Sequence, residues 1–230
     1  MTVTVHYLQN SRASRVVWLL EELGVSYKIK YYRRQASMLA PPELKEIHPS
    51  GSSPIIDDEG RVYAESGHIL DYLITKYGKG SNLKWRNEDE ENTIKYALFA
   101  AEGNIMVSGI MLGIPRIVGQ KLPAELSGSA DKVFKCVDEF YAAKEQHKCL
   151  KNLDEQLASN GGFFCNGRLT VADIMYENTV DILETIFHTI ENLNNDYPNI
   201  AKWYRSLNEL PKKIITNDKI KQLDEEKSIK

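Results

Sequence analysis

Two short motifs between residues 48 and 77 carry groups that can hold a peptide-like ligand. Ser53 precedes Pro54, and the residue before a proline is held extended, so its backbone N–H and C=O can pair with a peptide as an added strand. Glu65 precedes Ser66, where a helix is expected to begin, and a helix N-terminus offers a hydroxyl and free amides to a carboxylate. The two motifs together predict a binding site for a small peptide.

The elements that position these motifs form a small α/β layer. Residues 3–8 and 27–32 are rich in β-formers and flank an amphipathic run at residues 13–24, so they predict a βαβ unit with parallel strands and a right-handed crossover. A short helix opens at Pro41, two extended runs follow as an antiparallel hairpin, and another helix opens at Ser66. The predicted order is βαβαββα.

Strand signals stop near residue 88, and the rest of the chain has helical patterns. Thr170 and Asp173 have the spacing of a capping box at a helix start. Glycines around Pro115 predict that the first helix of this half bends or breaks near its end. The helical patterns cover residues 88–113, 129–158, 171–192, 198–209 and 211–224.

We therefore predict two domains. An α/β domain covers residues 1–80, an all-α domain covers residues 87–230, and Lys79–Arg86 is the linker between them. A chain of 230 residues is long enough for two domains of this size.

Composition and charge argue against several partners and chemistries. The formal net charge of −3 argues against a nucleic-acid partner and against binding to an anionic membrane surface. We expect neither a membrane-spanning segment nor a signal peptide. Cys136, Cys149 and Cys165 are odd in number and far apart, so we expect reduced cytosolic thiols rather than disulfides, a C-x-x-C redox motif or a cysteine-based metal site.

Four motifs in a fixed order connect these elements to a known family. The motifs are SSPII at residues 52–56, YAESGHILDYL at 63–73, LTVADI at 169–174 and YPNIAKWYRSL at 197–207. Together with the α/β layer and the helical half they cover nearly the whole chain, which resembles the cytosolic glutathione S-transferases, with a thioredoxin-like domain before a helical domain. The segments SRASRVVWLLEELG at 11–24, PPELKEIHPSGSSP at 41–54 and AESG at 64–67 look closest to the fungal GTT-type transferases, whose members associate with the endoplasmic reticulum.

The resemblance implies a transferase that conjugates the glutathione thiolate to small electrophiles in detoxification, with glutathione peroxidase activity as a side reaction. Glutathione is then a co-substrate, and no resident cofactor is implied. The resemblance also implies a cytoplasmic homodimer with peripheral association at the endoplasmic reticulum. The helical domain completes the electrophile site, in a pocket near Ile105, Met106, Ile110 and Met111.

The same fold leaves a second class of function open. A non-catalytic glutathione-binding or protein-interaction module would carry the same motifs, because a fold does not determine an activity. Thiol–disulfide exchange is disfavoured, since no cysteine stands at the start of the first helix.

The resemblance also assigns the glutathione-binding residues. Ser53 would pair with the cysteinyl unit beside a cis Pro54, while Ser66 would bind the γ-glutamyl carboxylate and Glu65 its ammonium. Ser52 is the first candidate for the glycine carboxylate, although relatives often carry Lys or Gln there. The weaker candidates for that contact are Lys45, His48 and Arg33.

Activation of the thiol is assigned to the turn before the first helix. Ser11 stands four residues before Arg15, where serine-type transferases carry their catalytic hydroxyl, and Asn10 stands where cysteine-using enzymes have their cysteine. We rank Ser11 first, Asn10 second and Tyr7 third, and a plain helix cap is the alternative role for Ser11. Glu102 is expected to reach the γ-glutamyl amine in the partner subunit, with a solvated glutamate as the alternative.

Overall fold

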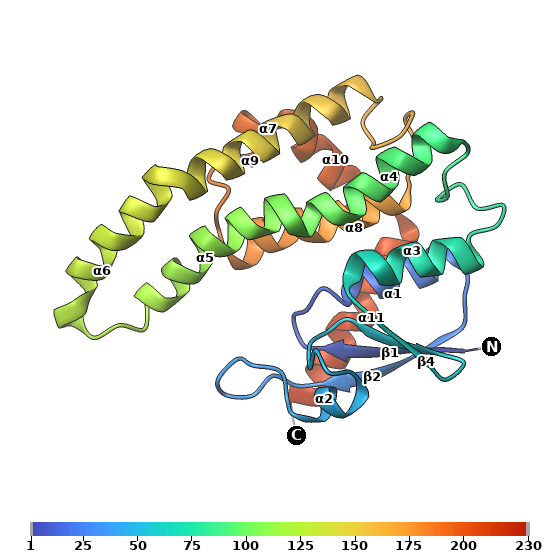
Figure 1. Cartoon of the computed structure of the whole chain (residues 1–230), viewed down its shortest axis with the longest axis horizontal. Coiled ribbons are helices and arrows are strands. Elements are labelled where there is room, and N and C mark those ends of the chain that lie inside the picture. Colours follow the sequence, from blue (N-terminus) through green and yellow to red (C-terminus); the bar gives the residue numbers. More distant parts are fainter. Residues whose placement is uncertain (1, 229–230) are drawn as a thin grey trace.

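The computed structural model, which describes residues 2–228, contains one four-stranded mixed sheet (Figure 1). Its strands are β1 (Val3–Leu8), β2 (Tyr27–Tyr32), β3 (Ile55–Asp58) and β4 (Arg61–Ala64). β1 pairs in parallel with β2 and antiparallel with β3, and β3 pairs antiparallel with β4, which gives the order β2-β1-β3-β4. The predicted βαβ unit and hairpin are both confirmed.

Helices cover both faces of this sheet. α1 (Ser14–Leu23) and α3 (Ser66–Tyr77) lie on one face, and the short α2 (Glu43–Ile47) lies on the other (Figure 1). Side chains alternate along β1, so Tyr7 joins the core under α1 and α3 while Leu8 packs with the residues under α2. The fold class, a thioredoxin-like α/β layer followed by helices, is confirmed.

The second part of the described chain is helical. Two long helical rods lie side by side and antiparallel (Figure 1). The first rod joins α4 (Glu88–Ala100), a π-helical turn η1 (Ala101–Met106) and α5 (Val107–Gly119). The second joins α6 (Ala124–Val137), a π-helical turn η2 (Asp138–Ala142) and α7 (Ala143–Ser159). The remaining helices are α8 (Val171–Asp181) with the π-helical turn η3 (Ile182–Ile186), α9 (Leu193–Asp196), α10 (Pro198–Asn208) and α11 (Pro211–Ser228).

The predicted break in the first rod is wrong, because the helix runs on through Pro115 to Gly119. Its glycines serve close packing instead. A Cβ added at Gly109 would lie 2.1 Å from Leu183 Cδ2, and one at Gly113 would lie 2.3 Å from Phe187 Cγ. The helix can therefore approach η3 closely only because these two positions carry no side chain.

The first rod also corrects the expectation that no segment has the length and apolar composition of a membrane span. Among the described residues, one helix passes that test, Glu88–Gly119. Within its most apolar stretch 56% is buried inside the protein, as in the core helix of a globular domain.

One hydrophobic core runs through both predicted domains. Val5 and Leu70 of the α/β layer belong to the same buried cluster as Met175 and Trp203 of the helical part. α11 returns from the far end of the chain to pack against α1. The domain limits near residues 80 and 87 remain predictions.

The predicted capping box at the start of α8 is present. The Asp173 carboxylate accepts from the Thr170 N–H at 2.8 Å, and also from Phe164 N–H and Trp203 Nε1–H. Burial raises the pKa of Asp173 to about 6 despite these donors. This carboxylate therefore fixes α8 against α10 and the preceding loop.

Candidate functional site

The hairpin brings the two sequence motifs to the same end of the sheet. Ile55 pairs with Ala64, so in this antiparallel register the Ser53–Pro54 peptide bond lies opposite Glu65 and Ser66. The Ser53–Pro54 bond is cis, as the resemblance implied. The end of β1 joins the same place, because the Leu8 N–H donates to Ser53 Oγ at 3.2 Å.

Ser53 keeps its main chain available. No backbone hydrogen bond engages its N–H or C=O within the part of the chain that the structure describes. These two groups can therefore pair with the backbone of an extended peptide. Its side chain has a different task, since Ser53 Oγ donates to the His6 carbonyl at 2.9 Å.

Ser66 opens α3 with unused donors. The first helical N–H with a partner at this end is that of Ile69, which bonds to Glu65 O at 2.9 Å, so the preceding amides are free for a ligand. Ser66 is 5% exposed, and its hydroxyl has no hydrogen bond among the described residues. Glu65 has φ 71°, a left-handed value that is unfavourable for glutamate, and its side chain is exposed beside this helix end. The start of α3 can therefore bind an anion, and the Glu65 carboxylate beside it can bind a cation.

The Ser11 hydroxyl lies beside that of Ser53. The two oxygens are 3.3 Å apart. Because the single proton of Ser53 already goes to the His6 carbonyl, Ser11 is the donor in this contact. Ser11 Oγ also accepts from the Ala13 N–H at 3.3 Å. The hydroxyl proton of Ser11 is therefore engaged only in the long, uncharged contact with Ser53 Oγ.

The start of α1 favours an anion at this turn. Its first turn contains no acidic residue. The Val16 and Val17 N–H groups both bond to Ala13 O, while those of Ser14 and Arg15 have no backbone partner among the described residues. Free amides and the positive end of the helix dipole thus lie directly after Ser11.

The other two candidates for thiol activation are placed differently. Asn10 is exposed with φ 49°, so this left-handed residue forms the corner of the turn. Tyr7 is 2% exposed, stacks on Tyr31, and has its pKa raised by burial. Tyr7 is a core residue, which leaves Ser11 as the hydroxyl at the turn.

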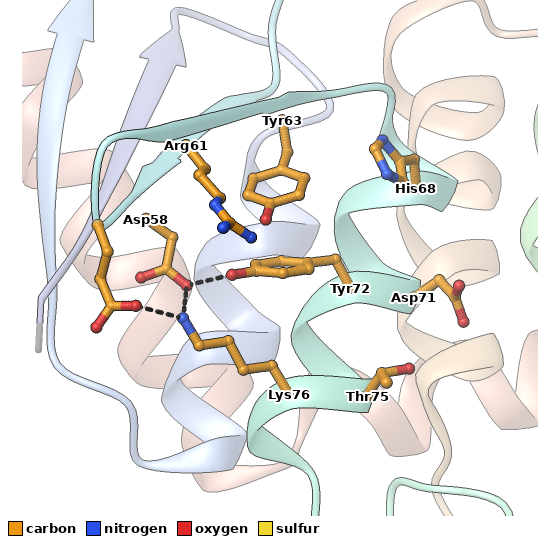
Figure 2. Close-up of a pocket in the computed structure, with 9 residues that line it drawn as sticks. Asp58, Arg61, Tyr63, His68, Asp71, Tyr72, Thr75 and Lys76 are labelled. Atoms are coloured by element: carbon orange, nitrogen blue, oxygen red, sulfur yellow. Dashed lines mark hydrogen bonds and ion pairs between the residues drawn. The ribbon is translucent and has the colours of Figure 1, made fainter.

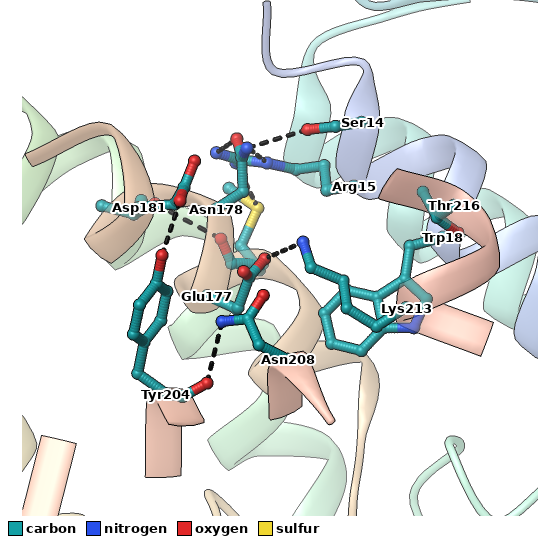
Figure 3. Close-up of polar contacts among 12 residues, drawn as sticks. Ser14, Arg15, Trp18, Glu177, Asn178, Asp181, Tyr204, Asn208, Lys213 and Thr216 are labelled. Atoms are coloured by element: carbon teal, nitrogen blue, oxygen red, sulfur yellow. Dashed lines mark hydrogen bonds and ion pairs between the residues drawn. The ribbon is translucent and has the colours of Figure 1, made fainter. Parts of the chain in front are cut away.

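Arg15 connects this turn to the helical part (Figure 3). It is 1% exposed, and its Nε and Nη2 donate to Asn178 Oδ1 at 3.1 and 2.8 Å. Asn178 Nδ2 donates in turn to Ser14 Oγ at 2.8 Å. The Arg15 Nη1 lies 2.8 Å from Glu102 Oε1, and Arg12 Nε lies 3.1 Å from Glu102 Oε2. Glu102 is therefore paired with its own chain's first helix.

A second buried pair lies next to this network. Lys213 Nζ of α11 lies 2.8 Å from Glu177 Oε2 and 5.0 Å from the Trp18 ring centre (Figure 3). Burial raises the pKa of Glu177, while Lys213 acts in the opposite direction. Glu177 and Asn178 are consecutive on α8, so α8 holds α11 with one side chain and α1 with the next.

Two family models match the chain. The one for the glutathione S-transferase N-terminal domain matches residues 11–76, and the one for the C-terminal domain matches residues 128–214. Glutathione S-transferase 1 of Saccharomyces cerevisiae is 31% identical over 215 residues, which cover 89% of each chain. The chain belongs to the glutathione S-transferase family.

One further relative agrees with this assignment, and one solved structure has the same fold. Glutathione S-transferase 3 of Schizosaccharomyces pombe is 30% identical over 220 residues, or 95% of this chain and 88% of the relative. The crystal structure of Ure2p5 from Phanerochaete chrysosporium, cocrystallised with 1-(S-glutathionyl)-2,4-dinitrobenzene, has the same fold with a TM-score of 0.71. It is 18% identical and covers 96% of this chain, and 95% of its own length is matched. The chain is thus a glutathione transferase by family.

In this transferase, a lysine of α2 lies beside the loop that carries Ser52. Ser52 is exposed and short, and its N–H lies 3.5 Å from Ser50 Oγ. Lys45 of α2 lies across Gly51, where an added Cβ would be 2.6 Å from Lys45 Cγ. His48 is used locally, since its Nδ1 lies 2.9 Å from Ser50 Oγ. The side-chain stem of Lys45 therefore packs against Gly51, and the order of Ser52 before Lys45 for the glycine carboxylate stays a prediction.

The structure divides the four residues of the expected electrophile pocket between the core and the surface. Ile105 and Met106 are 3% and 1% exposed, so they pack in the core and cannot line a pocket in this conformation. Ile110 is 37% exposed, and Met111 is half-buried. The π-helical turn at Ala101–Met106 shifts the helix face, which a regular helical period does not anticipate.

A separate polar cavity of about 680 Å³ lies between the hairpin and α3 (Figure 2). Asp58, at the turn end of the hairpin, accepts from Tyr72, Lys76 and Tyr77 of α3. Burial alone would raise the pKa of Asp58, but these three donors outweigh burial and lower the pKa. The cluster fixes α3 to the hairpin at the opposite end from Ser66.

Among residues 2–228, no group of His, Cys, Asp and Glu side chains could hold a metal ion.

Proposed function

We propose that this transferase conjugates glutathione to small electrophiles, with Ser11 as the hydrogen-bond donor to the thiolate. The observation that carries the proposal is the position of Ser11 Oγ, 3.3 Å from Ser53 Oγ at the start of α1. A peptide paired with the Ser53 backbone would have its cysteinyl side chain at this turn.

Activation requires a large shift of the thiol pKa. A free thiol has a pKa of about 8.5, and a shift of roughly two units corresponds to about 2.7 kcal/mol. The free amides at the start of α1 supply part of this stabilisation. Ser11 supplies the rest, because a hydrogen bond to an anion is stronger than the neutral contact to Ser53 that it would replace.

The three ionised groups of glutathione have candidate partners. Ser66 and the free amides of α3 would take the γ-glutamyl carboxylate, and Glu65 beside them would take the ammonium. Ser52 would take the glycine carboxylate, with Lys45 as a second donor beside the same loop. Ser53 and Pro54 would hold the cysteinyl unit between the two ends.

The experiment is a pH titration of the thiolate absorbance of bound glutathione, together with turnover of 1-chloro-2,4-dinitrobenzene and of cumene hydroperoxide. We expect a bound thiol pKa near 6.5, about two units below the free thiol, and turnover of the chloro compound. Turnover of the hydroperoxide as well would add the peroxidase activity. Tight binding with an unshifted pKa and no turnover would instead establish the non-catalytic binding module.

A homodimer is part of the same proposal. Tyr96 and Phe99 of α4 are 66% and 75% exposed, and α4 packs beside α3, so an apolar face stands next to the glutathione-binding layer. The Glu102 carboxylate keeps accepting positions beyond Arg12 and Arg15, so contact with a partner's γ-glutamyl amine remains a prediction. Sedimentation equilibrium of a Tyr96→Glu, Phe99→Glu double variant tests this assembly, and an unchanged dimer mass would place the interface elsewhere.

The cytoplasmic location and the peripheral association at the endoplasmic reticulum stay predictions.

A further inference from the structure

Arg34 binds the turn that carries Ser11 by its backbone. Its Nε donates to the Gln9 carbonyl at 2.9 Å and its Nη2 donates to the Asn10 carbonyl at 3.1 Å. The Gln9 N–H also bonds to Tyr32 O at 2.9 Å, so the turn is tied to the end of β2 twice. Arg34 comes 24 residues after Asn10, and no sequence motif marked it.

The two carbonyls bound by Arg34 fix the peptide planes on both sides of Asn10. Asn10 has φ 49°, a left-handed conformation that asparagine tolerates better than most residues with a side chain. The peptide plane that contains the Asn10 carbonyl also contains the Ser11 nitrogen. Holding that carbonyl therefore sets the direction in which the Ser11 side chain leaves the backbone.

Only a guanidinium can make this set of contacts. A third donor, Nη1, bonds to the Met38 carbonyl at 2.8 Å, so three nitrogens of one planar group reach three carbonyls. Lysine presents a single nitrogen and cannot span them. The Met38 contact also links the loop at residues 33–42 to the turn, so the loop and Ser11 are positioned together.

Within the described part of the chain, Arg34 contacts carbonyl oxygens and not carboxylates. Among residues 2–228, no ion pair includes Arg34. Burial lowers its pKa, and the nearby Arg12 lowers it further, although a guanidinium still stays protonated at neutral pH. The guanidinium is bound instead by the three backbone carbonyls, which places it in the structure as a support for the turn.

We propose that Arg34 is a positioning residue for thiol activation, which it controls through the backbone of Gln9 and Asn10 and not by touching glutathione. The inference rests on the proposed function of Ser11. A role in folding alone would change stability and leave the bound thiol unaffected. A role in positioning changes the thiol pKa and kcat while the glutathione Kd, set at Ser53 and Ser66, stays the same.

The test compares Arg34→Lys and Arg34→Met with a matched control, Arg116→Lys. Arg116 also donates to a backbone carbonyl, that of His188 at 2.7 Å, but it lies 14 residues beyond Glu102, roughly 20 Å along the rod at 1.5 Å per residue. We expect both Arg34 variants to raise the bound thiol pKa by about one unit and to lower kcat about tenfold, with Kd within about twofold of the wild type. The control should match the wild type in all three quantities.

Hydrogen exchange of the free protein gives a readout that does not depend on catalysis. In Arg34→Lys, the Gln9 and Ala13 amides, which bond to Tyr32 O and Ser11 Oγ, should exchange at least about tenfold faster, because the carbonyl anchors of the turn are lost. Wild-type thiol pKa and kcat in Arg34→Lys would overturn the proposal, whether or not the melting temperature falls. So would a defect confined to Arg34→Met, since that result would assign the effect to charge and not to the three-carbonyl geometry. An unshifted thiol pKa in the wild type would instead refute the proposed function, and this inference with it.

Discussion

The segment proposed to anchor glutathione and the turn proposed to activate it are held by different kinds of contact. The anchoring segment, residues 53–66, is one hairpin and the start of α3, and its two binding motifs face each other through the pairing of Ile55 with Ala64. The activating turn, residues 9–13, depends on side chains from distant places. Ser53, Arg34 and Asn178 all act on it or on the helix that follows it.

This difference separates binding from activation. A hairpin carries its own register, so the anchoring groups stay in place as long as the hairpin does. The turn is held across both domains, so changes far from the ligand can alter the thiol without altering binding. Four substitutions test this separation, and each is assigned to one of the two regions.

The largest effect is expected from Arg15→Met. The change leaves the buried Asn178 oxygen without donors and the Glu102 carboxylate with one partner, so the free energy of unfolding should fall by about 3 kcal/mol. The matched control is Arg12→Met, which removes the more exposed partner of the same carboxylate and should cost below about 1 kcal/mol. Urea unfolding followed by far-UV circular dichroism measures both. Equal losses would show that the turn is not held through α8.

Ser11→Ala should lower kcat about thirtyfold at pH 6.5, which corresponds to about 2 kcal/mol of transition-state stabilisation. The glutathione Kd should stay within about twofold, because the anchoring groups are unchanged. Stopped-flow turnover and calorimetric titration measure the two quantities. As a control, Ser159→Ala removes a hydroxyl that bonds only within α7 and should behave as the wild type. A loss of affinity in Ser11→Ala would mean that the two regions are not separate.

Asp58→Asn tests the support of the anchoring segment. The hydrogen bonds from Lys76, Tyr72 and Tyr77 lower the folded-state pKa of Asp58, so its stabilisation is fully present above the unfolded pKa of 3.8 and is lost as pH falls through the folded-state pKa. The variant should be less stable than the wild type by about 1.5 kcal/mol at pH 7, with the difference shrinking below pH 3.8. Urea midpoints across pH measure this difference. Asp57→Asn, one residue earlier in the same strand, is the control, and a difference that grew in acid would contradict the assignment.

Ser66→Ala should have the smallest effect. It should weaken glutathione binding and leave activation of the thiol unchanged, the reverse of Ser11→Ala. Loss of the hydroxyl at the start of α3 should raise the glutathione Kd about fivefold, or about 1 kcal/mol. The pKa of the bound thiol should not change, since the turn at Ser11 keeps its contacts. Calorimetric titration and thiolate absorbance measure the two. A shifted thiol pKa in Ser66→Ala would show that the anchoring segment also takes part in activating the thiol.

Local patterns in the sequence were enough for most of the fold and for the anchoring groups. The cap at Thr170 and Asp173, the hairpin and the helix start at Ser66 each depend on residues within about a dozen positions of one another, and their geometry follows from short-range rules. The same reasoning failed in the first long rod. The glycines at positions 109 and 113 predict a bend or break from sequence alone, whereas in the fold they contact residues more than seventy positions away.

The sequence by itself determined a βαβαββα layer followed by helices, and it placed the motifs of Ser53 and Ser66 where a peptide could be bound. Only the tertiary structure decided what surrounds Ser11. Arg34 and Asn178 have no fixed spacing from the groups that they bind, and their partners depend on how helices and loops pack. Backbone pairing propagates through neighbours along the chain, but the side-chain contacts that set the activating turn exist only after both domains have come together.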